Sequence, residues 1–251
     1  MGSSRSCAGR RGVAMMKPIM ALTRTRLAIV FCMAVRLAAQ FQPPLEAETA
    51  EEFDSYLMVE QAGEGRELIE RSDTFQKQWP ASKLLPRVWE LRFFAWQKLG
   101  RVAEARKAGE EALALAAGNL TVRAALAVQL ASEDPDAAER HAQTVLDELA
   151  KTKIRRGVPL AQYEMTAAKL RGQARVALGL VKYRRGDAAG ALAELEEADR
   201  LAPEPALSYR LGRLYAALGR TAEARRRLTE AARAADPVLA ERGRAALAEL
   251  R

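Results

Sequence analysis

Side chains that could carry out catalysis are few in this sequence, and they are not grouped. Histidine occurs once, as His141, and the two cysteines, Cys7 and Cys32, both lie near the start of the chain. A protein zinc site takes three or four ligands, and no Cys/His cluster offers them here. His141 lies in a stretch of helical pattern, so we interpret it as a half-exposed helix residue rather than a general base. We therefore predict neither a metal site nor a cofactor.

Carboxylates are frequent, but their spacing does not suit acid–base catalysis. Adjacent glutamates occur at Glu51-Glu52, Glu110-Glu111 and Glu196-Glu197. Neighbouring side chains on a helix diverge, so these pairs do not form the facing carboxylates that glycoside hydrolysis needs. The sequence also contains no glycine-rich phosphate loop and no GxSxG motif. We predict that the protein is not an enzyme; a helical-repeat enzyme that acts on polysaccharide through scattered glutamates remains an alternative.

The elements that carry these residues are expected to be helices. The 251 residues are rich in Ala, Leu, Arg and Glu, which lose little entropy in a helix, and 49% are hydrophobic. The excess of Ala and Arg is typical of a GC-rich bacterial genome. The net charge of +8 arises from residues 1–39, which hold seven of the 40 basic residues and no acidic one. The remainder is almost neutral and lacks the sustained basic footprint of a nucleic-acid binder.

Residues 1–39 have the pattern of a secretory signal sequence. Arg24 and Arg26 precede an apolar run at 27–35, and small residues lead to Ala39, where we expect cleavage. The run is shorter than the 20 or so residues that span a bilayer. The protein is thus predicted to be exported, as a periplasmic or secreted protein, although Arg36 leaves an uncleaved inner-membrane anchor open. The true start lies near residues 15–20 if the first methionine is misassigned, and residues 40–46 form a linker.

A period of 33 residues runs through the second half of the chain. The residues that recur are Leu178-Gly179, Gly186, Ala191, Leu195 and Ala198, repeated as Leu211-Gly212, Gly219, Ala224, Leu228 and Ala231. Small residues let two helices approach closely, and Gly186 and Gly219 fit the left-handed residue that ends a helix. Pro203 and Pro237 are expected to stop the second helix of each unit.

This pattern resembles the tetratricopeptide repeat (TPR), in which Leu-Gly, an aromatic residue, Gly, Ala, a large apolar residue, Ala and Pro recur along a helix pair. The resemblance, to an exported bacterial type, implies an all-α fold: a right-handed α-α superhelical solenoid with a C-terminal capping helix. Trp89, Trp96, Gly100, Ala105 and Ala112 extend the frame upstream. The expected solenoid spans 47–251, with units at about 47–80, 84–117, 119–150, 172–203 and 205–237 and a cap at 238–250.

Residues 150–171 exceed the period and form an insertion between the third and fourth units. Gly157 and Pro159 mark a loop, and the sequence then continues without a helix breaker, which predicts one long helix from about 160 to 184. We expect this helix to overhang the solenoid, where the insertion either carries partner specificity or is purely structural. Gly109 stands where the repeat usually has a large residue, so weaker packing is expected there.

The TPR resemblance also implies a binding site on the concave face of the first helix of each unit. The residues that its frame places on this face are Arg87, Glu90, Phe94, Gln97, Val176, Leu180, Tyr183, Tyr209 and Arg213. Tyr183 and Tyr209 are the strongest candidates, because an exposed aromatic residue beside an arginine is a typical binding hot spot.

The predicted function is therefore that of a non-catalytic scaffold or adaptor of the bacterial cell envelope, which binds a segment of another protein in this groove. The alternative is a membrane-tethered envelope assembly factor that contacts lipid or an acidic partner. Its contact surface would be the last repeat, rich in arginine at Arg210, Arg213, Arg220, Arg225, Arg226 and Arg227. We interpret these arginines as an ordinary solvated helix face in preference to such a contact surface.

Overall fold

The computed structural model describes residues 46–63, 65–152 and 159–250. The predicted signal sequence, its cleavage near Ala39 and its alternative role as an anchor lie outside these residues. Within the described ranges, no helix combines the length and the apolar character that crossing a membrane requires.

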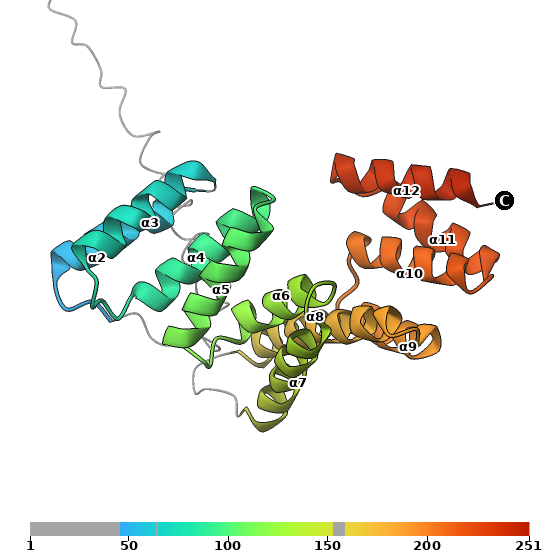
Figure 1. Cartoon of the computed structure of the whole chain (residues 1–251), viewed down its shortest axis with the longest axis horizontal. Helices are drawn as coiled ribbons and strands as arrows, with labels where there is room; N and C mark the ends of the chain where they lie inside the picture. Colours follow the sequence, from blue (N-terminus) through green and yellow to red (C-terminus); the bar gives the residue numbers. More distant parts are fainter. Residues whose placement is uncertain (1–45, 64, 153–158, 251) are drawn as a thin grey trace, which may run out of the picture. The chain divides into compact units, whose positions relative to one another are not determined.

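The described residues form helices joined by short turns, with no β-strand among them (Figure 1). The helices are α2 (Ala50–Gln61), α3 (Arg66–Gln78), α4 (Leu85–Lys98), α5 (Val102–Leu115), α6 (Leu120–Leu130), α7 (Pro135–Lys151), α8 (Leu160–Arg184), α9 (Ala188–Leu201), α10 (Pro205–Ala217), α11 (Thr221–Ala232) and α12 (Pro237–Glu249). Each helix packs against the next one along the chain, and α10 also contacts α12. The predicted all-α solenoid of helix pairs with a capping helix is confirmed.

Three helix pairs turn in the same way. Gly100, Gly186 and Gly219 follow α4, α8 and α10 with φ angles of 68°, 85° and 73°. At each glycine the next residue donates its backbone N–H back across the end of the helix, as Asp187 does to the Lys182 carbonyl at 2.9 Å. This bond satisfies a carbonyl that the helix leaves free. Glycine adopts the left-handed conformation at no steric cost, so the predicted role of Gly186 and Gly219 is confirmed.

Close contact between the two helices of a pair depends on glycine in the last two units. A Cβ atom at Gly179 would lie 2.9 Å from the Leu195 side chain, and one at Gly212 would lie 2.6 Å from the Leu228 side chain. Both distances are shorter than van der Waals contact allows, so a larger residue would push α9 or α11 away. The buried apolar cores of the last two units are therefore built on these two glycines.

Packing at Gly109 differs from the expectation. A Cβ atom there would lie 3.0 Å from the Phe93 ring, and Phe93 is fully buried. The aromatic ring on α4 fills the space that a large residue on α5 would otherwise occupy. The prediction of weaker packing is therefore wrong, because a large residue on the partner helix compensates for the glycine.

The ends of the last helices also differ from the expectation. α11 ends at Ala232, and Pro237 is the first residue of α12. Proline fits this position, since the first helical N–H has no partner inside the helix and the ring fixes a helical φ. Asp236 caps the same end by accepting a hydrogen bond from the Val238 N–H at 2.8 Å. Pro237 therefore starts the capping helix and does not stop α11.

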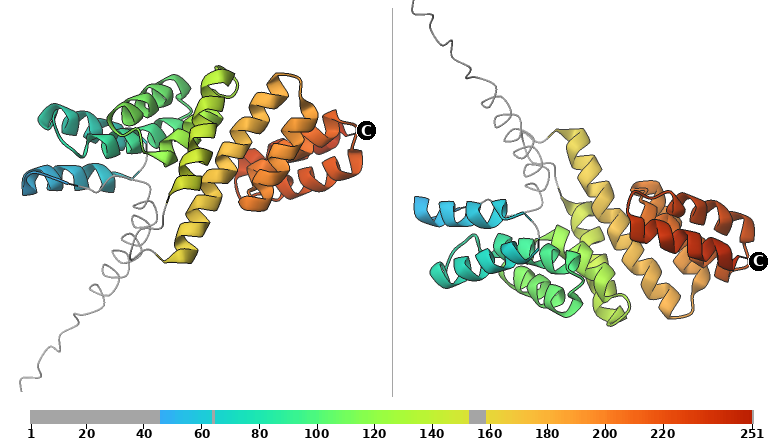
Figure 2. Two further views of the ribbon diagram at one scale, coloured as in Figure 1. Left: turned by 90° about the horizontal axis from the view of Figure 1, so that it is seen from below. Right: turned by 90° about the horizontal axis from the view of Figure 1, so that it is seen from above.

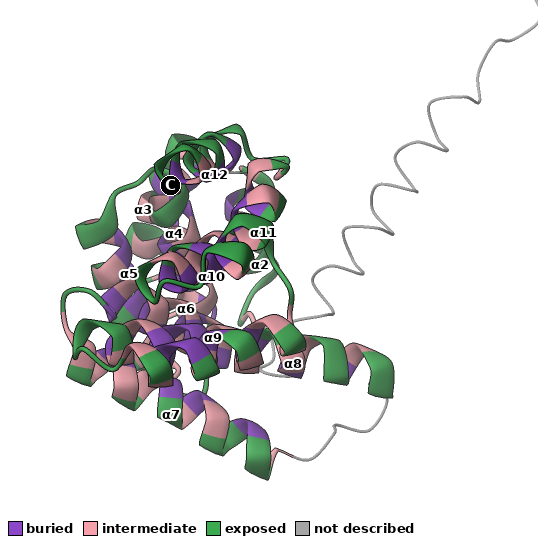
Figure 3. Cartoon of the chain, turned by 90° about the vertical axis from the view of Figure 1, so that its right-hand side faces the viewer, coloured by how far each residue is buried: buried purple, intermediate pink, exposed green. Residues whose placement is uncertain are grey.

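The 25-residue helix α8 confirms the single helix predicted from about 160 to 184 (Figure 2). Its expected overhang is wrong, because the extra turns pack against α7. Tyr163, Ala167 and Leu170 are buried in one cluster with Val145 and Leu149 of α7. Figure 3 shows this alternation of buried and exposed positions along α8. The additional length of α7 and α8 is thus used to extend the core between them.

Candidate functional site

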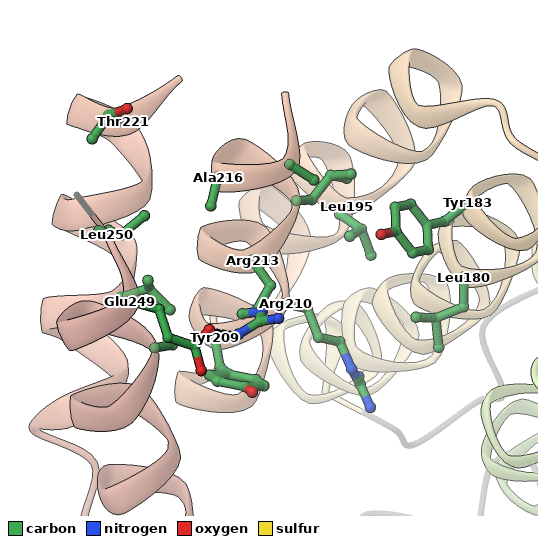
Figure 4. Close-up of a pocket in the computed structure, with 15 residues that line it drawn as sticks. Leu180, Tyr183, Leu195, Tyr209, Arg210, Arg213, Ala216, Thr221, Glu249 and Leu250 are labelled. Carbon is green, nitrogen blue, oxygen red and sulfur yellow. Dashed lines mark hydrogen bonds and ion pairs between the residues drawn. The ribbon is translucent and has the colours of Figure 1, made fainter. Parts of the chain in front are cut away.

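A cavity of about 610 Å³ opens among the last units of the solenoid (Figure 4). Its walls come from α8, α9, α10, α11 and α12, and four of the nine predicted site residues line it: Leu180, Tyr183, Tyr209 and Arg213. Apolar residues of the repeat core form much of the remaining wall. This mixture of apolar wall and a few polar groups is typical of sites that bind a ligand or a partner segment.

The polar groups of this cavity come from facing helices. Tyr183 on α8 is 52% exposed, whereas Tyr209 on α10 is half-buried. Arg213 on α10 donates a hydrogen bond to Glu249 of α12 at 2.6 Å. The capping helix therefore forms one side of the cavity, with Leu250 beside Glu249 in the wall. Two tyrosine rings are left accessible to a ligand.

A second cavity, of about 260 Å³, lies among α4, α6, α8 and α10 and includes two more predicted site residues, Gln97 and Val176. The Gln97 side-chain amide donates to the Gln129 side chain at 3.0 Å. Val176 is only 7% exposed, so it contributes little surface. Lys169, Glu204 and Arg210 supply the charged groups of this cavity.

Arg210 lines both cavities. Our sequence prediction named it only among the arginines of the last repeat and not among the residues of the concave face. Within the described part of the chain, no hydrogen bond or ion pair reaches its half-buried side chain. Burial lowers the pKa of Arg210, and the attraction of Glu204 opposes this shift only in part. The repeat pattern contains a signal for this residue. Arg210 lies nine residues before Gly219, and the residues nine places before Gly186 and Gly100 are the apolar Ala177 and Leu91.

The remaining three predicted residues, Arg87, Glu90 and Phe94, are engaged in internal contacts. Glu90 is 3% exposed; it accepts a hydrogen bond from Asn119 at 2.9 Å and an ion pair from Arg87 at 2.9 Å. Phe94 packs edge-on against Phe93, with ring centroids 4.9 Å apart. Glu90 is therefore a structural carboxylate rather than a group that a partner can reach.

Asn119 provides a buried hydrogen-bond partner for Glu90. Its side-chain oxygen accepts the Val122 N–H at 3.1 Å and so caps the start of α6. Its side-chain amide donates to Glu90 on α4. One residue thus joins two units and satisfies an unpaired helix donor.

In the described ranges of the chain, no three His, Cys, Asp or Glu residues lie close enough to hold a metal ion. The Nδ1 atom of His141 lies 3.3 Å from the Arg123 guanidinium. Burial and this neighbouring positive charge lower the pKa of His141. The paired state of His141 agrees with its interpretation as a half-exposed helix residue.

Half of the six arginines in the Arg-rich last unit form ion pairs within the chain. Arg213 pairs with Glu249, Arg220 with Glu223, and Arg227 with both Asp199 and Glu230. These ion pairs use three of the arginines for contacts within and between helices. The basic surface available to lipid or to an acidic partner is correspondingly smaller.

The successive helix pairs define an α-solenoid, and both cavities are lined by its helices α8 and α10. Among solved structures, its fold is similar to that of a thermophilic TPR protein from Thermus thermophilus, with 21% identity and a TM-score of 0.49 over 78% of this chain and 99% of that chain. Comparison with protein families and with curated proteins finds no match. The solenoid assignment rests on this chain's own helix pairs and glycine contacts.

Proposed function

We propose that this protein is a non-catalytic scaffold that binds a segment of another protein in the groove formed by the two cavities. The observation that carries the proposal is the convergence of Leu180, Tyr183, Tyr209 and Arg213 on one cavity. These residues come from two helices that the 33-residue period relates, and they present aromatic and apolar surface beside charged groups. Partner segments commonly bind to such surfaces through a few aromatic and arginine anchors.

The proposed place of action is the bacterial cell envelope. This part of the proposal is supported by the sequence alone, through the basic and apolar pattern of residues 24–39. The groove itself would serve equally in a released or in an anchored protein. Mass determination of the protein purified from its own cells distinguishes the two, since an anchored form retains residues 21–39.

The groove is tested by crosslinking and capture from the envelope fraction. Wild type is compared with a Tyr183→Ala, Tyr209→Ala double variant and with a Phe53→Ala, Met58→Ala control, which removes exposed apolar side chains from α2 instead. We expect wild type and control to capture the same few proteins. The double variant should bind at least about tenfold more weakly, because truncating an aromatic hot spot typically costs about 2 kcal/mol or more.

Two other outcomes would redirect the proposal. Equal capture by all three proteins would retain a scaffold but remove the groove as its site. Capture by none, together with binding to anionic vesicles that depends on Arg225 and Arg226, would favour the membrane-tethered assembly factor. Both arginines are exposed on α11, which makes them the residues to test for that alternative.

A further inference from the structure

We infer that the segment held in this groove carries an internal Asp or Glu side chain, flanked by apolar residues, which pairs with Arg210 between the two cavities. This inference rests on the proposed function and specifies the chemistry of the partner. Two observations support it: among the described residues Arg210 lacks the ion pair that most other half-buried arginines form, and it lines both cavities.

Most half-buried arginines of the described residues pair with a carboxylate. Arg123, Arg171 and Arg210 do not, and of these three only Arg210 lines the two cavities. Arg87, Arg92, Arg175 and Arg227 all have side chains with restricted exposure, and each forms an ion pair with a carboxylate of the chain. The guanidinium of Arg210 forms none with any described residue. Removing a charge from water is costly unless a partner replaces the lost hydration. The free protein thus holds a partly desolvated cation for which a ligand carboxylate is the natural partner.

Apolar residues lie on both sides of Arg210. Val176 of α8 and Leu207 of α10 line the smaller cavity. Leu180 of α8 and Leu214 of α10 line the larger one. Figure 4 shows the Arg213 side chain directed towards Glu249, whereas that of Arg210 extends towards Leu180. The carboxylate Glu249 is thus already occupied by Arg213. An acidic side chain of the ligand would find Arg210 available with apolar residues on both sides of it, and in the smaller cavity it would also meet Lys169 and Glu204.

The position of Arg210 favours an internal carboxylate over a chain terminus. Because Arg210 belongs to the walls of both cavities, a segment that passes through both places an interior residue beside it. A C-terminal carboxylate at Arg210 would end the segment there and leave one cavity empty. Pairing of a guanidinium with a carboxylate in such a partly dehydrated site is charge-assisted and directional, so it selects for position as well as for charge.

The test uses a display library of short random peptides selected against the purified protein, followed by synthetic peptides with acetylated and amidated ends. Wild type should select peptides with an Asp or Glu at a fixed place between apolar residues. Replacing that residue by Asn or Gln should weaken binding to wild type by about tenfold or more. The same replacement should have almost no effect on binding to Arg210→Gln, which gives a coupling energy for the pair.

Arg226→Gln is the matched control, because it removes the same charge from an exposed position outside both cavities. It should behave as wild type at constant ionic strength. Peptides that lose binding in the Tyr183→Ala, Tyr209→Ala variant but bind equally well with the acid neutralised would overturn this inference and leave the groove intact. Peptides that are insensitive to the tyrosines and to Arg210 would overturn the groove itself. A requirement for a free C-terminal carboxylate would also overturn the internal-residue assignment.

Discussion

Arg87 and Arg210 are both half-buried arginines on the first helix of a helix pair, yet their surroundings are opposite. Arg87 on α4 lies 2.9 Å from Glu90 and 4.0 Å from Glu60. Burial opposes its charge, but Glu90 and Tyr56 outweigh burial and raise the pKa of Arg87. On α10, burial lowers the pKa of Arg210 because no comparable carboxylate faces it. Arg87 is therefore paired within the chain, whereas Arg210 has no carboxylate partner among the described residues.

This difference shows how one repeat frame can serve two purposes. At equivalent places in the frame, Glu90 of the second unit is buried in a polar network, and Tyr209 of the last unit lines a cavity. Local propensity is similar in both regions, since both form regular helices. The two places differ in whether neighbouring residues supply polar partners, as Asn119 and Arg87 do for Glu90. Four experiments test this difference between the two regions.

The largest effect is expected from Glu90→Gln. This change removes the charge that faces Arg87 and weakens the acceptor for Asn119. Breaking a buried, hydrogen-bonded ion pair on one side typically costs about 3–5 kcal/mol, and Glu60 should moderate the loss to about 3 kcal/mol. Urea unfolding followed by circular dichroism measures it. Glu110→Gln, which removes an exposed i,i+4 pair with Arg106, should cost about 0.5 kcal/mol or less.

A loss for Glu90→Gln no larger than that of the Glu110→Gln control would mean that the N-terminal network is not satisfied by Glu90. Arg87 could then no longer serve as the example of a paired arginine with which Arg210 is compared.

The second experiment compares Arg87→Met with Arg210→Met. Methionine retains an unbranched apolar stem while removing the charge. Arg87→Met leaves Glu90 buried without its cation and should lower the free energy of unfolding by about 2–3 kcal/mol. Arg210→Met removes an unpaired, partly buried charge, so the free energy should stay constant or rise by up to about 1 kcal/mol. Equal destabilisation by the two changes would show that Arg210 has a structural partner in the free protein.

The third experiment tests the ion pair at the edge of the groove. Arg213 and Glu249 are both largely exposed, so Glu249→Gln should lower the unfolding free energy by about 0.5 kcal/mol or less. The melting temperature would then fall by about 2 °C or less for a chain of this size. α12 should remain attached, because Ala240, Gly243 and Ala246 are buried beneath it. Loss of amide protection throughout α12 in hydrogen exchange would contradict this and make the pair the main attachment of the cap.

The sequence predicts the helix pairs and their turns well because their causes are local or strictly periodic. Gly186 and Gly219 signal the left-handed turn by type alone, and Gly179 signals close helix contact by its place in the period. The packing of α8 on α7 was not predictable from the period, because it depends on the burial of Tyr163 against another helix. Compensation of Gly109 by Phe93 is likewise a contact between helices.

Candidate site residues were harder to predict for the same reason. The frame placed Tyr183 and Tyr209 on a face that does line a cavity, but it could not show that Asn119 closes the equivalent place around Glu90. Arg210 was left out of the predicted concave face because the frame places only its neighbours Tyr209 and Arg213 there, and the equivalent residues Ala177 and Leu91 are apolar. A charged residue at a position where the other units are apolar is the signal that would have found it.

The smallest expected effect on stability concerns the contact of Arg123 with His141. This contact is intermediate between the ion pair of Arg87 and the unpaired state of Arg210. Arg123 donates to the Ala117 carbonyl at 2.6 Å and faces the His141 ring rather than a carboxylate. Burial comes first in lowering the pKa of His141; Arg123 and Arg140 lower it further, against the attraction of Glu110 and Asp134.

Because the folded pKa of His141 lies below the unfolded value of about 6.5, the unfolded chain binds the proton more tightly. The free energy of unfolding should therefore fall as the pH decreases through 6.5 towards the folded pKa, and it should be fully retained above 6.5. His141 is the only histidine, so His141→Gln should flatten urea midpoints measured between about pH 5 and pH 7. An unchanged slope in this variant would show that Arg123 and burial do not disfavour the charged ring.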